Sequence, residues 1–173
     1  MNMVDFSKAL IEAKNTAYKG VVRPVEGTIL TVAKDISIAS EEIIKETNDL
    51  ETFLEKIVQA ADISVQNTPE LLPILKQAGV VDSGGKGLFY IFEGFLKFLR
   101  GESLETSTTK LVQPIALMEG GEMEEIEPGQ DFEVIVDFRP ANPLNLDSFY
   151  SDLTEMGTSI QVGEGDGMYR MHI

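Results

Sequence analysis

The sequence predicts an α+β protein, with a wholly helical domain followed by a small α/β sandwich. Apolar residues recur at helical spacing in the first part of the chain. Beyond it they alternate with polar residues, as in "DFEVIVDF". The polar stretch "GESLETSTTK" separates the two patterns. We therefore expect a helical domain at 1–102, a linker at 103–109 and the α/β part at 110–173.

Composition limits the classes of function. Of the 173 residues, 43% are hydrophobic, which is enough to bury a core. The 29 acidic and 14 basic side chains give a formal net charge of -15, and the basic residues form no local patch. Binding to nucleic acid or to an anionic membrane is therefore not expected. The absence of cysteine excludes disulfides and thiolate metal sites.

Neither a signal peptide nor a membrane span is expected. The stretch "MNMVDFSKALIEAK" lacks a basic region followed by an apolar one. The longest apolar run, "GLFYIFEGFLKFL", is short and contains Glu93 and Lys97. These features predict a cytoplasmic protein.

Three amphipathic helices are expected first. Phe6, Leu10 and Ala17 share a face of the first helix, and the second follows "RPVEG". The third runs through "LETFLEKIVQAADISV". The second helix can begin at Thr28 as its N-cap.

Two further helices are expected before the linker. In "TPELLPILKQAG", Thr68 suits an N-cap, Pro69 the first turn and Gly79 the stop, while Pro73 lowers the regularity. The last helix, at 87–99, is apolar on nearly all sides. Such a helix is typical of the centre of a bundle, or of a face covered by a partner.

The remaining chain predicts a β-α-β-β unit. "KLVQPIALM" can form an edge strand because it contains Pro114. The helix "NLDSFYSDLTEMG" should begin after Asn145 and end at Gly157, and "GEGDG" should turn a final hairpin. "DFEVIVDF" should be a half-buried strand, with one face formed by Phe132, Val134, Val136 and Phe138.

The stretch "KQAGVVDSGGKGLF" is the first candidate site. It is not a Walker-A loop, because Gly85 stands where that motif has lysine and Lys86 is followed by glycine. Asp82 or Ser83 could instead cap a helix whose glycines allow close packing. Alternatively, the free N–H groups of a helix N-terminus could receive a nucleotide. By spacing alone, the interpretation as a helix cap with close-packed glycines is favoured over nucleotide binding.

Two other features are weaker candidates. "RPVEGTILTVAKD" could direct the Thr28 hydroxyl towards a ligand, although a simple N-cap is the favoured interpretation. His172 is the sole histidine, and one histidine without cysteine makes a poor metal site by itself, although Glu133 could lie on a neighbouring strand. We assign no catalytic residue and no metal ligand in this chain.

Three segments together resemble a known family: "RPVEGTILTVAKD", "TPELLPILKQAGVVDSGGKGLFYIFEGF" and "FYSDLTEMGTSIQVGEGDGMYRMHI". They are similar to the A subunit of bacterial fatty acid kinase, whose first domain is DhaL-like, as in dihydroxyacetone kinase. That resemblance implies an antiparallel helix barrel that binds ATP at one end. It also implies magnesium held by a DGDTGTN-type motif that is not found in this sequence. The chain is thus expected to be a fragment that starts within the nucleotide domain, and to be inactive alone.

The resemblance carries over a set of nucleotide-binding residues from two turns. The first turn corresponds to the family segment near the adenine, and the second to the D-x-G-G turn. The residues are Gly27, Thr28, Ile29, Leu30, Asp82, Ser83, Gly84 and Gly85. Many family members have a cysteine near the place of Glu133 and a H-x-H pair near His172.

The implied function is part of an ATP-dependent kinase subunit. In the resembled family, the phosphoryl group goes to a fatty acid carboxylate on a DegV-type carrier protein. The cofactors implied are ATP and Mg, with the Mg ligands outside this chain, and a homodimer is expected. One alternative is a non-catalytic interaction module with a vestigial nucleotide turn. Another is a subunit of dihydroxyacetone (glycerone) kinase type.

Overall fold

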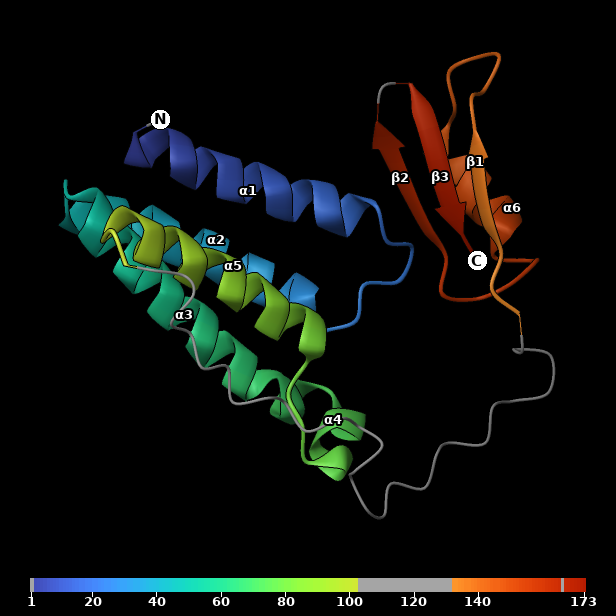
Figure 1. Cartoon of the computed structure of the whole chain (residues 1–173). Coiled ribbons are helices and arrows are strands. Elements are labelled where there is room, and N and C mark those ends of the chain that lie inside the picture. The colour runs from blue at the N-terminus through green and yellow to red at the C-terminus, as the bar shows by residue number, and fades with distance from the viewer. Residues whose placement is uncertain (1, 103–131, 166) are drawn as a thin grey trace. The chain divides into compact units, whose positions relative to one another are not determined.

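A computed structural model describes residues 2–102, 132–165 and 167–173, and Figure 1 shows the chain. The described residues form five helices, α1 to α5, followed by β1, α6, β2 and β3. The predicted α+β class is confirmed. Among the described residues, one compact unit comprises 2–15 and 25–102, and a second comprises 16–24 and 132–173 apart from 166.

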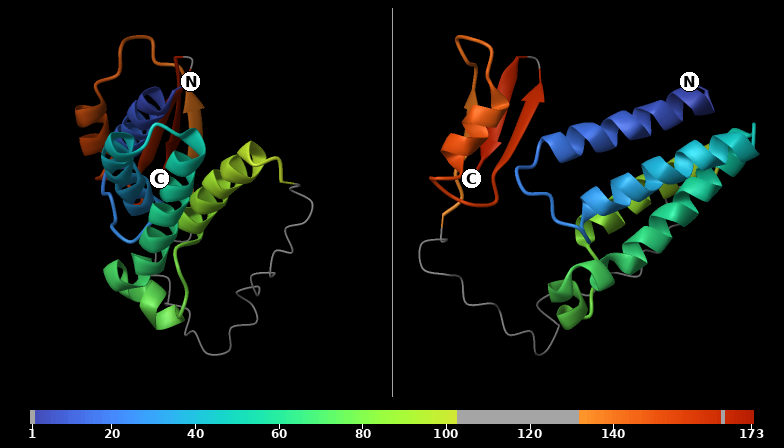
Figure 2. Two further views of the ribbon diagram at one scale, coloured as in Figure 1. Left: turned by 90° about the vertical axis from the view of Figure 1, so that its left-hand side faces the viewer. Right: turned by 180° about the vertical axis from the view of Figure 1, so that it is seen from behind.

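The first unit is built on three long helices. In Figures 1 and 2, α2, α3 and α5 run side by side. α2 and α5 begin at the same end, because a Cβ on Gly84 would lie 3.3 Å from the Cβ of Ile29. The helices of this unit are α1 (Met3–Lys19) up to residue 15, α2 (Ile29–Glu46), α3 (Leu50–Leu71), α4 (Pro73–Ala78) and α5 (Ser83–Leu99).

The core of this unit lies between α2, α3 and α5. Phe53 is fully buried at its centre, and the ring of Phe6 from α1 packs edge-on at 5.8 Å between centroids. α1 also contributes Ser7, whose buried hydroxyl lies 2.8 Å from that of Ser40. The buried apolar set is Val32, Ile36, Ile43, Phe53, Leu54, Ile57, Ala61, Val65, Phe89, Phe92 and Leu96.

The predicted start of the short helix at Thr68 is wrong. α3 continues through Pro69 to Leu71, and α4 begins at Pro73, which occupies the first turn as proline prefers. Pro69 has no N–H to donate to the carbonyl of Val65. The Thr68 hydroxyl donates to that carbonyl instead, at 2.6 Å.

The predicted stop of this helix is confirmed. Gly79 is its C-cap, in the left-handed conformation at φ 66°. The next helix, α5, begins at Ser83, earlier than residue 87 where it was expected.

α5 is not covered on all sides by the described residues. Its buried face carries Phe89, Phe92 and Leu96. Side chains on the opposite face remain accessible, with Phe98 79% exposed. The exposed apolar set is Tyr90, Ile91, Phe95, Phe98 and Leu99, which we call the outer α5 face.

The second unit holds a three-stranded antiparallel sheet in the order β1-β3-β2. The predicted hairpin is confirmed, and Gly167 in its turn has φ 67°. Asn145 caps α6, as expected, by accepting from the amide of Ser148. α6 ends at Leu153, before the expected Gly157. The elements are β1 (Ile135–Phe138), α6 (Leu146–Leu153), β2 (Gln161–Gly165) and β3 (Met168–His172).

β1 differs from the predicted half-buried strand. It begins at Ile135, and Phe132 and Val136 are 86% and 39% exposed. Phe138 contacts the rings of Phe149 on α6 and Tyr169 on β3. β1 lies at the sheet edge, where alternation in sequence does not ensure that another layer covers the apolar face.

Residues 16–24 make their contacts within the second unit. The carbonyl of Gly20 accepts from the amide of Val162 at 3.0 Å, and Val21 forms a bridge with Gln161. The Tyr150 hydroxyl donates to the carbonyl of Lys19 at 3.2 Å. The predicted linker at 103–109 and the predicted strand at 110–118 lie outside the described residues.

Candidate functional site

The first predicted turn forms the N-cap of α2, and the hydrogen bonds of its threonine stay within the turn. Gly27 has φ 86°, which favours glycine, and Thr28 is the N-cap. The Thr28 hydroxyl donates to the carbonyl of Val25 at 2.8 Å and accepts from the amide of Leu30 at 3.3 Å. Because its single proton is used within the turn, this hydroxyl can only accept a hydrogen bond from a ligand.

The second predicted turn starts α5. Asp82, rather than Ser83, is the N-cap, and its carboxylate accepts from the amide of Gly85 at 2.6 Å. The carbonyl of Asp82 accepts from the amide of Lys86 at 3.0 Å. The predicted role of Asp82 as a helix cap is therefore correct. The N-terminus of α5 lies beside this residue.

The two turns lie against each other. A Cβ on Gly85 would come within 2.8 Å of Val32 on α2, closer than real side chains approach. The glycine thus allows the first turns of α2 and α5 to touch. Gly87 has no such role, since a Cβ there would meet nothing within 4 Å. All eight predicted site residues come together at one end of the helices.

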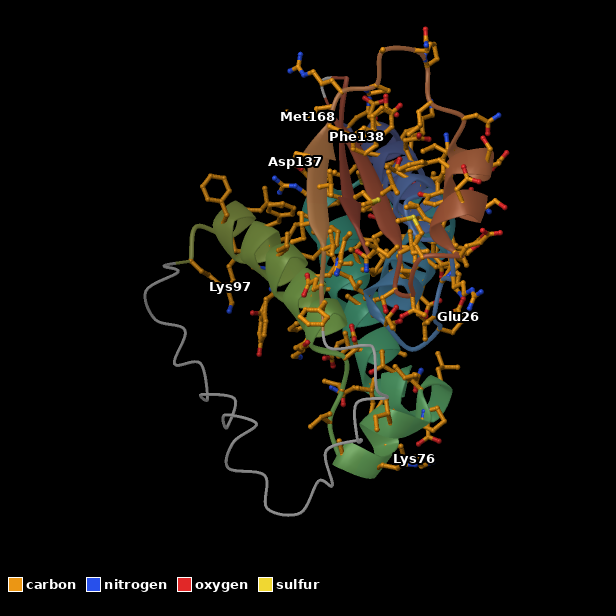
Figure 3. All side chains as sticks on the ribbon, turned by 90° about the vertical axis from the view of Figure 1, so that its right-hand side faces the viewer. Glu26, Lys76, Lys97, Asp137, Phe138 and Met168 are labelled. Carbon is orange, nitrogen blue, oxygen red and sulfur yellow. The ribbon has the colours of Figure 1, made fainter. Side chains whose placement is uncertain are left out.

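Backbone groups at this end attract an anion, although the negatively charged Asp82 carboxylate also lies there. Helix geometry leaves the first amides without intrahelical acceptors, including those of Ile29, Ser83 and Gly84. Two helix dipoles also end here with positive sign. The nearby carboxylate of Glu26, labelled in Figure 3, accepts from Thr31 at 2.6 Å and pairs with Lys34 at 2.7 Å. That pairing offsets the one negative charge of the first turn.

The Lys86 side chain is held by other contacts and is not directed to the N-termini of α2 and α5. Its amine lies 3.3 Å from Asp62 on α3 and 3.8 Å from the centroid of the Phe89 ring. The anion-attracting groups are therefore backbone amides rather than a lysine.

One residue of the site was missed by the sequence analysis. The hydroxyl of Thr68, which is fully buried, accepts from the amide of Asp82 at 3.0 Å. The sequence feature that could have pointed to it is a threonine directly before a proline, Thr68 before Pro69. We interpreted this pair as the start of a helix.

No three His, Asp or Glu side chains come together as a metal site among the described residues. In the second unit, His172 Nε2 lies 3.0 Å from Glu133 Oε1. Both line a cavity of about 430 Å³, together with Met156 and Ser159, the latter at φ 56°. The expected nearness of Glu133 and His172 is thus found, as a pair and not as a complete ligand set.

No helix among the described residues is long and apolar enough to cross a membrane.

Fold and site define a helical domain in which the N-termini of α2 and α5 lie together, followed by a small α/β unit. Residues 1–97 match the family model of the DAK2 domain. The chain belongs to the DAK2-domain family, and it carries a DhaL-like nucleotide-binding domain of the dihydroxyacetone kinase type.

The chain is similar to several staphylococcal proteins. An uncharacterized protein of Staphylococcus saprophyticus is 36% identical over 180 residues, covering 100% of this chain and 33% of its own length. An uncharacterized protein of Staphylococcus haemolyticus is 39% identical over 166 residues, covering 92% of this chain and 30% of its own. The chain therefore spans about a third of the curated relatives it matches.

Proposed function

We propose that this chain supplies one wall of the ATP site of a kinase subunit. The observation that carries the proposal is the junction of the α2 and α5 N-termini within a DAK2 domain. Amides at a helix N-terminus bind phosphate oxygens directly, and two adjacent dipoles add to that attraction. We place Ile29, which is 42% exposed, and Leu30 beside the adenine.

The rest of the machinery belongs, in this proposal, to a longer cytoplasmic protein. Phosphoryl transfer needs metal ions to neutralise charge. The described residues offer no such ligand set. Because the sequence contains no DGDTGTN-type motif, we expect the Mg ligands outside this chain, and no transfer by the chain alone. The intact protein would move the γ-phosphoryl group of ATP to a carboxylate oxygen of a fatty acid on a DegV-type carrier, giving ADP and an acyl phosphate.

The site is tested by Mg·ATP titration calorimetry on the intact protein. Asp82→Ala and Thr28→Ala should each weaken binding roughly tenfold, equivalent to about 1.4 kcal/mol, because either loss removes the cap that holds the backbone amides of its turn in place. Each should also cost about 1 kcal/mol of stability, as lost N-caps do.

Asp49→Ala is the matched control. Asp49 caps α3 in the same way, through the amide of Thr52, but α3 runs antiparallel to α2 and α5 (Figure 1). Asp49→Ala should destabilise the protein without changing ATP affinity. Unchanged affinity in Asp82→Ala and Thr28→Ala would show that the site is assigned wrongly.

The acceptor is tested separately. The intact protein should form ADP in the presence of a fatty-acid-loaded DegV-type carrier and not with dihydroxyacetone. The opposite result would assign it to the dihydroxyacetone kinase type.

A second candidate function is a homodimerisation module. The outer α5 face favours it, because exposed aromatic side chains at helical spacing are typical of protein interfaces. Sedimentation equilibrium of this chain should then show a dimer that Phe98→Glu dissociates. A monomer at high concentration would exclude this function, and a dimer together with no ATP binding by the intact protein would favour it.

A further inference from the structure

The end of α3 is in contact with both turns of the proposed ATP site. Thr68 lies on α3, three residues before its end, and is fully buried. A buried hydroxyl is costly unless it is hydrogen-bonded, and this one makes two such bonds. It donates to the carbonyl of Val65 at 2.6 Å and accepts from the amide of Asp82 at 3.0 Å.

The donated bond lies where Pro69 removes a backbone donor. In an uninterrupted helix the carbonyl of Val65 would accept from the amide at position 69. Proline has no such amide, so the Thr68 hydroxyl takes its place. This fixes the direction of the hydroxyl, and its remaining lone pairs face the amide of Asp82.

The accepted bond places the second turn. Asp82 is held through its backbone amide by Thr68, and through its carboxylate it caps the amide of Gly85. The start of α5 is thereby connected to α3 across 14 residues of sequence.

The first turn rests on the same segment. A Cβ on Gly27 would lie 2.9 Å from the carbonyl oxygen of Thr68 and 2.7 Å from the Cβ of Leu72. The backbone of Gly27 is therefore in close contact with the last turn of α3, while Thr28 caps α2 beside it. One short piece of α3 thus touches both turns.

We infer that Thr68 is a positioning residue, whose hydroxyl sets the Asp82–Gly85 turn against the Gly27–Leu30 turn for binding of the ATP phosphates. The inference rests on the proposed function for its ligand. The positioning itself can be measured without a nucleotide. Thr68 need not touch ATP, because it acts through the amide of Asp82.

Thr68→Val and Thr68→Ser test the hydroxyl. Valine keeps the shape of threonine without the hydroxyl, whereas serine keeps the hydroxyl. Ser40→Ala is the control, because it also removes a buried hydroxyl from the same unit. That hydroxyl bonds to the hydroxyl of Ser7 and to the carbonyl of Ser37. If Thr68→Val does not fold, Thr68→Cys replaces it, since a thiol makes only weak hydrogen bonds.

The first measurement is amide hydrogen exchange of this chain without nucleotide. Thr68→Val should speed exchange at Asp82 and Gly85 by about tenfold or more, as a lost hydrogen bond implies. Thr68→Ser should restore the wild-type rates, and Ser40→Ala should leave these two amides unchanged. Equal rates in wild type and Thr68→Val would overturn the inference.

The second measurement is the Kd for Mg·ATP of the intact protein. Thr68→Val should raise it about tenfold, Thr68→Ser should return it to within about threefold, and Ser40→Ala should not change it. Unchanged affinity in Thr68→Val, or no rescue by serine, would overturn the role in binding. If the wild-type intact protein binds no ATP, the proposed function fails, and the exchange rates still decide whether Thr68 holds the turn.

Discussion

The two units differ in how tightly their described residues are packed. In the helical unit, Phe53, Ile57 and Val65 are completely buried between three helices. In the α/β unit, the buried set is Leu153, Ile160 and Val162, each 4–5% exposed, and the apolar side chains of β1 lie open. Packing thus holds the helical unit, whereas backbone pairing and side-chain pairs across the strands have a larger share in the sheet. Substitutions of buried side chains in the first unit should therefore be costly, and substitutions of exposed side chains in the sheet should be mild.

The largest effect is expected for Phe53→Ala. Removing this ring from a fully buried position should cost about 3–5 kcal/mol, because it leaves a cavity beside Phe6. Urea unfolding followed by helical circular dichroism measures the loss. The control Phe98→Ala, at a 79% exposed position, should change stability by less than about 0.5 kcal/mol. Similar losses in both variants would contradict the difference in packing.

A smaller effect is expected where α2 meets α5. Gly85→Ala would place a Cβ 2.8 Å from Val32 and should destabilise the unit by about 1–3 kcal/mol. Gly87→Ala meets open space on the same helix and should stabilise it by about 0.5–1 kcal/mol. Thermal unfolding of the two variants side by side measures the difference. A stabilised Gly85→Ala would mean that the two helix starts are not in close contact.

The smallest effect is expected for an exposed cross-strand pair in the sheet. The Arg170 guanidinium donates two hydrogen bonds of 2.7 Å to Asp137 (labelled in Figure 3), and this holds the pKa of Asp137 below its ordinary value. A lowered carboxyl pKa stabilises the folded state above the unfolded-state pKa. That contribution is lost as the pH falls through the lowered value, so it disappears only in strongly acidic solution.

NMR titration of the Asp137 carboxyl carbon measures this pKa, and Arg170→Gln is the control. The substitution should move the pKa of Asp137 back towards its ordinary value, and salt should weaken the effect because the pair is exposed. If Arg170→Gln leaves the pKa of Asp137 unchanged, the pair with Arg170 does not stabilise the sheet.

Local signals in the sequence predicted much of the fold. Thr28, Gly79 and Asn145 act at helix ends as expected, because caps depend on neighbouring residues. The end of α3 was predicted wrongly, and the bond between the Thr68 hydroxyl and the amide of Asp82 joins residues 14 apart in sequence. Contacts of residues 16–24 with the sheet also depend on positions far along the chain.

The candidate site was predictable in part. Residues of the two turns were predicted from their resemblance to a family, and the structure brings the two turns together. Their roles within the turns required coordinates. Thr28 uses its proton on Val25, and Asp82 rather than Ser83 caps α5.

Amide hydrogen exchange of the intact protein with and without Mg·ATP tests the central claim most directly. If the α2 and α5 N-termini form a wall of the ATP site, nucleotide should slow exchange at Ile29, Ser83 and Gly84. The amide of Thr52, at the start of the antiparallel α3, should exchange at the same rate in both states. Protection that appears elsewhere and leaves Ile29, Ser83 and Gly84 unchanged would contradict the claim.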